Sequence, residues 1–175
     1  LTVGQRLQLP MSLDFSVFDG GELKGASPTI AVSVPTQSSQ PGKKFVAPKL
    51  GSDGFDWPVE GEIITEFGPS GRGVHNDGVN IAANMGTPVT VSATGTVAFV
   101  GDNIKNFGKL VLVKHDGGII TAYAHLDSIK VREGDVLATG DSIGNVGSTG
   151  RVDRPQLHFE IRKSRQPIDP RSLIS

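Results

Sequence analysis

The protein has 175 residues, no cysteine and a formal net charge of −1. The lack of cysteine excludes disulfides, thiolate metal sites and cysteine nucleophiles, and the near-neutral charge gives no electrostatic basis for binding nucleic acid or an anionic membrane. No apolar run approaches the roughly 18 residues of a membrane-spanning helix. The 23 glycines and 11 prolines, together with many Val, Ile and Thr residues, predict short strands joined by tight turns.

Residues 1–54 differ in composition from the rest of the chain. The first ten, LTVGQRLQLP, resemble the last strand of a LysM repeat, a module that binds the glycan of peptidoglycan. They lack an initiator methionine, so we expect them to lie within a longer protein whose targeting information comes earlier. Residues 11–54 include a stretch rich in Ser, Pro, Gly, Gln and Lys and predict a linker. If this linker is ordered, we expect it to pack along the following domain as an added strand that blocks the partner site.

Residues 55–175 contain the regular structure. Short β-rich runs are separated by Gly, Asp and Asn, and no amphipathic helical pattern of convincing length occurs. The longest hairpin signal is KLVLVKHDGGIITAYAHL, which predicts two strands joined by a turn at Asp116, Gly117 and Gly118. We predict an all-β domain, either a small barrel or two packed sheets.

All four histidines lie in this domain. His115 adjoins the predicted turn, so we expect it to be solvated. His125 ends the second strand of the hairpin, where alternation puts it on the same face as a threonine and a tyrosine. In QLHFEIR, alternation puts Gln156, His158 and Glu160 on one face and three apolar side chains on the other. This pattern predicts that His158 lies outside the core.

The order of five motifs along residues 55–170 indicates a family resemblance. The motifs are WPVEGEIITEFG, HNDGVNIAANMGTPVTVSATGTVAFVG, GKLVLVKHDGGIITAYAHL, VREGDVLATGDSIGNVGSTG and QLHFEIR. In this order they resemble a lysostaphin-type (LytM) peptidoglycan endopeptidase domain, which implies a small β-rich fold whose sheet forms a long groove. Active members bind zinc with the His and Asp of an H-x-x-x-D motif and the second His of H-x-H. A Y-x-H-L histidine and the first His of H-x-H assist water attack on a peptide bond.

The resemblance places two histidines and one glutamine of this sequence at motif positions that bind zinc or assist catalysis in active members. His158 matches the second His of H-x-H, and His125 matches the Y-x-H-L histidine. Gln156 occupies the first H-x-H position. Glutamine neither takes nor gives a proton near neutral pH, so it cannot replace a histidine in acid–base work.

The H-x-x-x-D motif is altered at both of its metal positions. Asn80 stands where the zinc-binding Asp belongs, and the histidine position falls on Asn76, with His75 one residue early. A neutral amide does not bring a carboxylate's charge to Zn²⁺, so we expect no metal cofactor and no enzyme activity. The alternative is an active zinc endopeptidase that uses shifted ligands at His75, Asp77 and His158.

These losses resemble the NlpD, EnvC and DipM group of the family, cell-division proteins that activate N-acetylmuramoyl-L-alanine amidases instead of cutting peptidoglycan. The resemblance implies a non-catalytic regulator of septal splitting in the periplasm or cell envelope, with an amidase, peptidoglycan and the division machinery as partners. The altered groove is expected to bind the amidase, helped by Arg151 and Arg154 of the loop GSTGRVDRPQ, which can pair with acidic side chains.

A binding module without amidase activation is a third possibility. GTPVTVSATGTVAFVGD and VREGDVLATGDSIG resemble the half-barrels of biotinyl and lipoyl carrier domains. No lysine stands in the expected context at the hairpin tip, so this resemblance indicates kinship of fold only. Binding to the cell wall alone remains an open alternative.

Overall fold

The computed structural model describes residues 54–71 and 73–174. The LysM-like residues 1–10 and the predicted linker up to residue 53 lie outside the described residues. Within the described part of the chain, no helix has the length and apolar character needed to cross a membrane.

Almost all regular structure in the described residues is β. The strands are β1 (Glu62–Thr65), β2 (Gly68–Ser70), β3 (Val74–Asn76), β4 (Val79–Ala82), β5 (Pro88–Thr90), β6 (Gly95–Ile104), β7 (Gly108–His115), β8 (Ile119–Ile129), β9 (Val136–Leu137), β10 (Ser142–Val146), β11 (Gln156–Lys163) and β12 (Gln166–Ile168). Two 3-10 turns accompany them, η2 (Asp116–Gly118) and η3 (Pro170–Ser172). The all-β prediction is confirmed.

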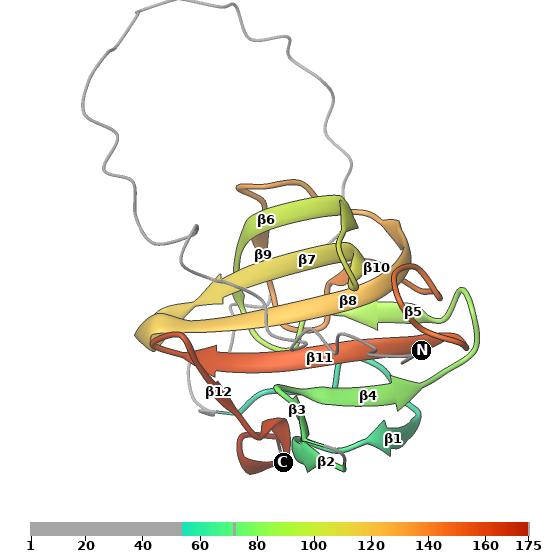
Figure 1. The fold of residues 1–175 in the computed structure, drawn as a ribbon. Coiled ribbons are helices and arrows are strands. Elements are labelled where there is room, and N and C mark those ends of the chain that lie inside the picture. The colour runs from blue at the N-terminus through green and yellow to red at the C-terminus, as the bar shows by residue number, and fades with distance from the viewer. Residues whose placement is uncertain (1–53, 72, 175) are drawn as a thin grey trace, which may run out of the picture. The chain divides into compact units, whose positions relative to one another are not determined.

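Ten of these strands form one antiparallel sheet (Figure 1). Its main path runs β1-β4-β11-β8-β7-β6-β9, while β10 joins β5 to β8 and β12 pairs with β11. The hairpin β2–β3 forms a separate small sheet. The path ends at β1 and β9, which do not pair with each other, so the sheet is not a closed barrel.

The predicted hairpin is present as β7 and β8. The tight turn η2 joins them, and its glycines Gly117 and Gly118 have φ angles of 73° and 71°. Residues with an L side chain rarely adopt this left-handed backbone conformation, which explains why two glycines follow Asp116 in the turn.

The apolar core lies against one face of this sheet. The predicted apolar side chains of β11, Leu157, Phe159 and Ile161, are fully buried. They belong to a cluster that also contains Val79, Ile81, Val89, Val91, Val111, Val113, Tyr123, Leu126, Ile143 and Val146. Burying these branched and aromatic side chains supplies most of the driving force for folding.

The opposite, polar face of β11 is buried as well. His158 and Glu160 are 0% exposed and Gln156 is 5% exposed. Phe107, from the turn between β6 and β7, packs over the ring of His158 with 5.7 Å between ring centroids. His158 therefore lies outside the apolar cluster, as predicted, but it is not a solvated side chain. Alternation assigns a residue to a face and does not reveal what covers that face.

The prediction that His115 is solvated is wrong. Its side chain is 6% exposed, with Nδ1 donating to the Thr94 carbonyl at 2.9 Å and Nε2 lying 2.8 Å from Thr121 Oγ1. Burial lowers the pKa of His115, opposed by the Thr94 hydrogen bond and the nearby charge of Asp116. The residue adjoins a turn, but its ring points back between β6 and β8, where both ring nitrogens have partners.

Candidate functional site

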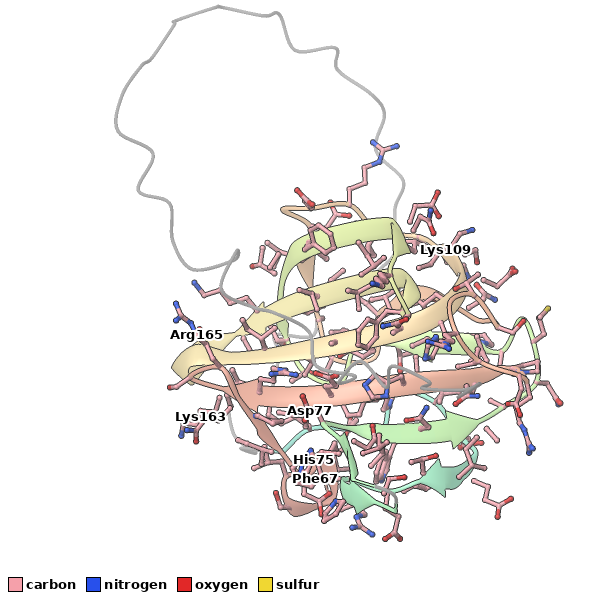
Figure 2. The ribbon with its side chains drawn as sticks, in the orientation of Figure 1. Phe67, His75, Asp77, Lys109, Lys163 and Arg165 are labelled. Carbon is pink, nitrogen blue, oxygen red and sulfur yellow. The ribbon has the colours of Figure 1, made fainter. Side chains whose placement is uncertain are left out.

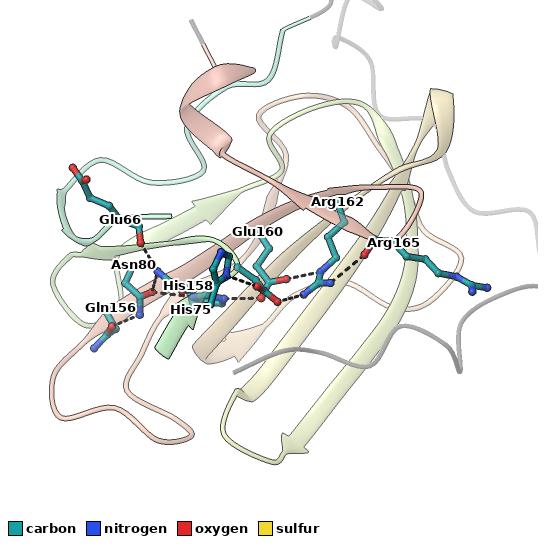
Figure 3. Close-up of polar contacts among 10 residues, drawn as sticks. Glu66, His75, Asn80, Gln156, His158, Glu160, Arg162 and Arg165 are labelled. Atoms are coloured by element: carbon teal, nitrogen blue, oxygen red, sulfur yellow. Dashed lines mark hydrogen bonds and ion pairs between the residues drawn. The ribbon is translucent and has the colours of Figure 1, made fainter. Parts of the chain in front are cut away.

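Strands β4 and β11 bring the candidate residues together. Their antiparallel register pairs Asn80 with His158 and Ala82 with Gln156. Asn80 therefore lies between the side chains of Gln156 and His158, although 76 and 78 residues of chain separate it from them (Figure 3). These side chains come together because of the register between β4 and β11, and not because they are close in sequence.

Three carboxamides form a hydrogen-bonded chain across the site. Asn76 Nδ2 donates to the Glu66 carbonyl at 3.1 Å and to Asn80 Oδ1 at 3.2 Å. Asn80 Nδ2 donates to Gln156 Oε1 at 2.7 Å, and Gln156 Nε2 donates to the Arg154 carbonyl at 3.3 Å. Backbone carbonyls are the acceptors at both ends of this row of amides. The amide group that faces each carbonyl must therefore be the NH₂ group, which fixes the orientation of all three amides and makes Asn80 Oδ1 an acceptor.

This orientation determines the hydrogen-bond partners of His158. Its Nδ1 lies 2.9 Å from Asn80 Oδ1, and its Nε2 lies 2.8 Å from Glu160 Oε1. Both neighbours are acceptors at hydrogen-bond distance, so both ring nitrogens are occupied. Neither nitrogen is free to bind a metal or to act as a base while these contacts hold.

A buried chain of alternating charges continues from this ring along the same face of β11. Glu160 Oε2 accepts from Arg162 Nε at 2.8 Å, and Arg162 Nη2 donates to Asp77 Oδ2 at 2.8 Å. Burial alone would raise the pKa of Glu160, but the hydrogen bonds and charges of His158 and Arg162 outweigh it and hold that pKa below its usual value. Each buried charge therefore has a partner, which such burial requires.

His75 and Asp77 lie at the end of this chain, beside the small hairpin (Figure 2). On β3, His75 is exposed while the next residue, Asn76, is buried, so a shift of one residue does turn the side chain away from the site. His75 Nδ1 donates to Asp77 Oδ1 at 2.9 Å, and its ring packs edge-on against Phe67.

The side chains at this site do not fit a zinc ion. Catalytic zinc needs three deprotonated ligands from His, Cys or carboxylates. Here both ring nitrogens of His158 are hydrogen-bonded, Asn76 and Asn80 are neutral amides, and Arg162 occupies the second oxygen of Asp77. Residues 54–71 and 73–174 contain no group of three or more His, Cys, Asp or Glu side chains arranged to hold a metal.

His125 lies 6.1 Å from His158, ring centroid to ring centroid, and makes a different set of contacts. Its backbone φ is 64°, a left-handed conformation that is costly for a side chain of this size. Nδ1 donates to the Thr149 carbonyl at 2.8 Å, while Nε2 is buried and has no partner among the described residues. Burial lowers the pKa of His125 to about 4, against a smaller opposing effect of the Thr149 hydrogen bond, so the ring is neutral at physiological pH.

Thr149 fastens the loop before β11 to the end of β8. Its carbonyl accepts from His125, its Oγ1 donates to the Leu126 carbonyl at 2.6 Å, and the backbone N–H of Lys109 donates to the same Oγ1 at 3.1 Å. Gly108 packs so closely that a Cβ there would lie 2.4 Å from the Thr149 carbonyl carbon. These contacts fix one wall of the site.

The site opens into a groove of about 800 Å³. The amides of Asn80 and Gln156 form part of its lining, and the loop from Gly150 to Arg154 forms a wall that includes Arg151. The groove is lined by Ile64, Thr65, Asn80, Gly150, Arg151, Val152, Asp153, Arg154 and Gln156. Of the predicted site residues, the structure brings these two amides and two arginines to the groove, whereas His75, Asn76, Asp77, His125 and His158 are not part of its lining.

Sequence reasoning assigned no role in the site to three residues that hold it together. Glu160 and Arg162 share the polar face of β11 with His158, and this alternation is a signal that both belong to the same network. Thr149 has no such signal, because its role depends on contacts with residues more than twenty positions away.

The described features recur in a known family. The family model for "Peptidase family M23" matches residues 74–170, more than half of the chain, and spans β3, β4, the hairpin β7–β8 and β11. The chain belongs to peptidase family M23. The lysostaphin-type resemblance drawn from its motifs is confirmed at this level.

Several curated M23 relatives carry names linked to cell division or to murein hydrolase activation. The chain is 48% identical over 130 residues to "Cell division protein DipM" of Caulobacter vibrioides, covering 71% of this chain and 21% of that protein. It is 41% identical over 117 residues to "Lipoprotein NlpD/LppB homolog" of Pseudomonas aeruginosa, covering 67% and 38%. It is 38% identical over 114 residues to "Murein hydrolase activator NlpD" of Escherichia coli, covering 65% and 29%. The chain thus spans between about a fifth and two fifths of these proteins.

Solved structures of M23 peptidases share the fold. A zinc-containing peptidase from Vibrio cholerae superposes with a TM-score of 0.62 at 31% identity, covering 67% of this chain and 39% of that one. This chain is thus similar both to a peptidase that contains zinc and to proteins named as activators of a murein hydrolase.

We predict that His125 acts in this M23 domain as a structural donor. Replacing it with alanine removes the hydrogen bond to the Thr149 carbonyl and should lower the free energy of unfolding by about 1–3 kcal/mol. Asparagine tolerates left-handed backbone and can place an amide N–H where Nδ1 now lies, so His125→Asn should stay within about 1 kcal/mol of wild type.

Urea unfolding monitored by circular dichroism measures both variants, with the exposed Lys130→Ala as control. Equal losses for His125→Asn and His125→Ala would contradict the assignment of a donor role.

Proposed function

We propose that this domain is a non-catalytic regulator that binds and activates N-acetylmuramoyl-L-alanine amidases during septal peptidoglycan splitting in cell division. The observation that carries the proposal is His158, which is held between Asn80 Oδ1 and Glu160 Oε1 and so has no free nitrogen. The printed names of the relatives, cell division protein and murein hydrolase activator, agree with a regulatory role.

The contacts of the site argue against peptide-bond hydrolysis. A metal-bound water needs a well-held ion to reach a pKa near 7, and the amides of Asn76 and Asn80 bring no negative charge to one. Gln156 cannot shuttle a proton, and the Nε2 of His125 is buried away from the groove. The alternative ligand set of His75, Asp77 and His158 would have to break two ion pairs, one at His158 and one at Asp77.

The groove is suited to binding a peptide segment instead. Its amides are already fixed by the hydrogen-bonded chain, so little ordering entropy is lost when a partner docks. Arg151 and Arg154 are exposed at its wall and offer charge-assisted hydrogen bonds to acidic side chains. Activation then requires that the groove bind the open state of the amidase more tightly than its closed state.

The remaining assignments complete this proposal. Residues 1–10 would be the end of a LysM repeat that holds the protein on peptidoglycan, and residues 11–54 would be the tether that lets the groove reach its partner. Two of the relatives are named as lipoproteins or activators of a murein hydrolase, which supports a place in the cell envelope, and we propose the periplasm.

An assay on dye-labelled sacculi tests the proposal. The protein alone should release no dye, and adding it to an amidase of its own organism should raise dye release several-fold, because the groove selects the open amidase. Failure to stimulate any such amidase would contradict activation, and sacculus binding without stimulation would favour a wall-binding module. Cleavage of cross-bridge peptides by the protein alone, abolished by His158→Ala, would instead support the zinc endopeptidase.

A gain of metal binding is expected when the amides are replaced. Asn76 Nδ2 and His158 Nδ1 lie 3.2 and 2.9 Å from Asn80 Oδ1. Ligand atoms of a tetrahedral zinc site with bonds of about 2.0–2.1 Å are about 3.3 Å apart, so both distances from Asn80 are close to those that a zinc site requires. The double variant Asn76→His/Asn80→Asp should therefore bind one zinc per chain.

Metal analysis after dialysis against zinc measures this stoichiometry in the variant and in wild type. Gln156→His is the matched control, since it adds an imidazole without a carboxylate and should bind no more zinc than wild type. Stoichiometric zinc in the wild-type protein would overturn the proposal.

A further inference from the structure

A second hollow adjoins the groove. It has a volume of about 500 Å³ and is lined mainly by the chain before β1, the loop after β4 and the residues before β11. The side chains that matter for binding are Glu60, Glu62, Met85 and Arg154.

The groove and the second hollow are continuous along the chain. Arg154 lines both of them, and β1, β4 and the start of β11 each pass from one into the other. On β1, Ile64 lines the groove and Glu62 lines the second hollow. On β4 the corresponding residues are Asn80 and Ala82, and at the start of β11 they are Gln156 and Pro155. A single bound segment can therefore contact both.

The two ends of this continuous surface carry opposite charge. The groove is lined by Arg151, Arg154 and Asp153, two positive charges and one negative, whereas the second hollow is lined by Glu60, Glu62 and the shared Arg154, two negative charges and one positive. Glu60, Glu62, Arg151 and Arg154 are all exposed. Glu60, Glu62 and Arg151 form no ion pair within the described part of the chain, and Arg154 has only a loose one, 3.7 Å from Asp153. All four charges are available to a partner.

Met85 adds an apolar contact at the second hollow. Its side chain is 55% exposed, one of two large hydrophobic side chains that are exposed among the described residues. Methionine is flexible and adapts to varied apolar partners, which suits a docking surface.

We propose that the groove and the second hollow together bind one segment of the amidase that carries acidic side chains at one end and basic side chains at the other. The acidic end faces Arg151 and Arg154, the basic end faces Glu60 and Glu62, and an apolar side chain packs on Met85. This proposal rests on the proposed function and adds the direction of binding, because a reversed segment would place like charges together.

Charge reversal in the full-length chain tests this arrangement. Binding to each purified amidase of the source organism is measured by biolayer interferometry at low and physiological salt. Glu60→Lys/Glu62→Lys and Arg151→Glu/Arg154→Glu should each weaken binding about tenfold or more, mainly through slower association. Asp102→Lys/Asp116→Lys is the matched control for the glutamate variant, since it makes the same charge change at two exposed residues that line neither hollow, and it should bind like wild type.

The outcomes separate this inference from the proposed function. Suppose that wild type binds, the arginine variant fails to bind and the Glu60/Glu62 variant binds normally. The second hollow is then not part of the binding surface, and this inference is overturned while the proposed function stands. Equal weakening by the control variant would mean that net charge, and not position, determines binding, which also overturns it. Wild-type protein that binds no amidase overturns the proposed function and this inference together. Circular dichroism of each variant shows that a loss of binding is not a loss of fold.

Discussion

The site depends on one oxygen atom, Asn80 Oδ1, which accepts hydrogen bonds from both Asn76 and His158. This oxygen must be an acceptor, because the row of three amides ends at the backbone carbonyls of Glu66 and Arg154, which fix the orientation of each amide. A carboxamide thus lies beside the imidazole, at the position where the resemblance to active members of the family implies a zinc-binding carboxylate.

The chain of charges behind His158 makes this arrangement stable. Isolated buried charges would be costly, but Glu160, Arg162 and Asp77 alternate in sign, and contacts of 2.8 Å join them to one another and to His158. Removing any one member would take one hydrogen-bonded partner from each of its neighbours in the chain. The same network keeps the polar face of β11 rigid beneath the groove, so the groove presents fixed amides and a fixed wall to whatever docks there. On our proposal, the M23 fold serves for binding at this groove without a change of fold.

Motif order was enough to predict the all-β fold, the hairpin β7–β8 and the family, because glycine turns and strand alternation are local properties of sequence. Alternation also grouped Gln156, His158 and Glu160 on one face, yet it could not show that Phe107 covers that face. The same limit explains His115, whose burial depends on Thr94 and Thr121 across neighbouring strands.

Two properties of the site could not be predicted from the sequence. The left-handed backbone of His125 and its bond to Thr149 depend on how the loop before β11 folds over β8. The hydrogen bonding of His158 depends on the direction of three amides, which only the positions of two distant carbonyls determine. Residue identity led to the prediction that zinc ligands are missing, and the register of β4 and β11 was needed to see which hydrogen bonds these side chains make.

The most direct test of this account is nitrogen NMR of the His158 ring in the purified, metal-free protein near neutral pH. If Asn80 and Glu160 both accept from the ring, its two nitrogens will both show directly bonded protons, with cross-strand contacts from the Nδ1 proton to Asn80. A spectrum with one unprotonated ring nitrogen, or one that shifts on adding zinc, would contradict the account.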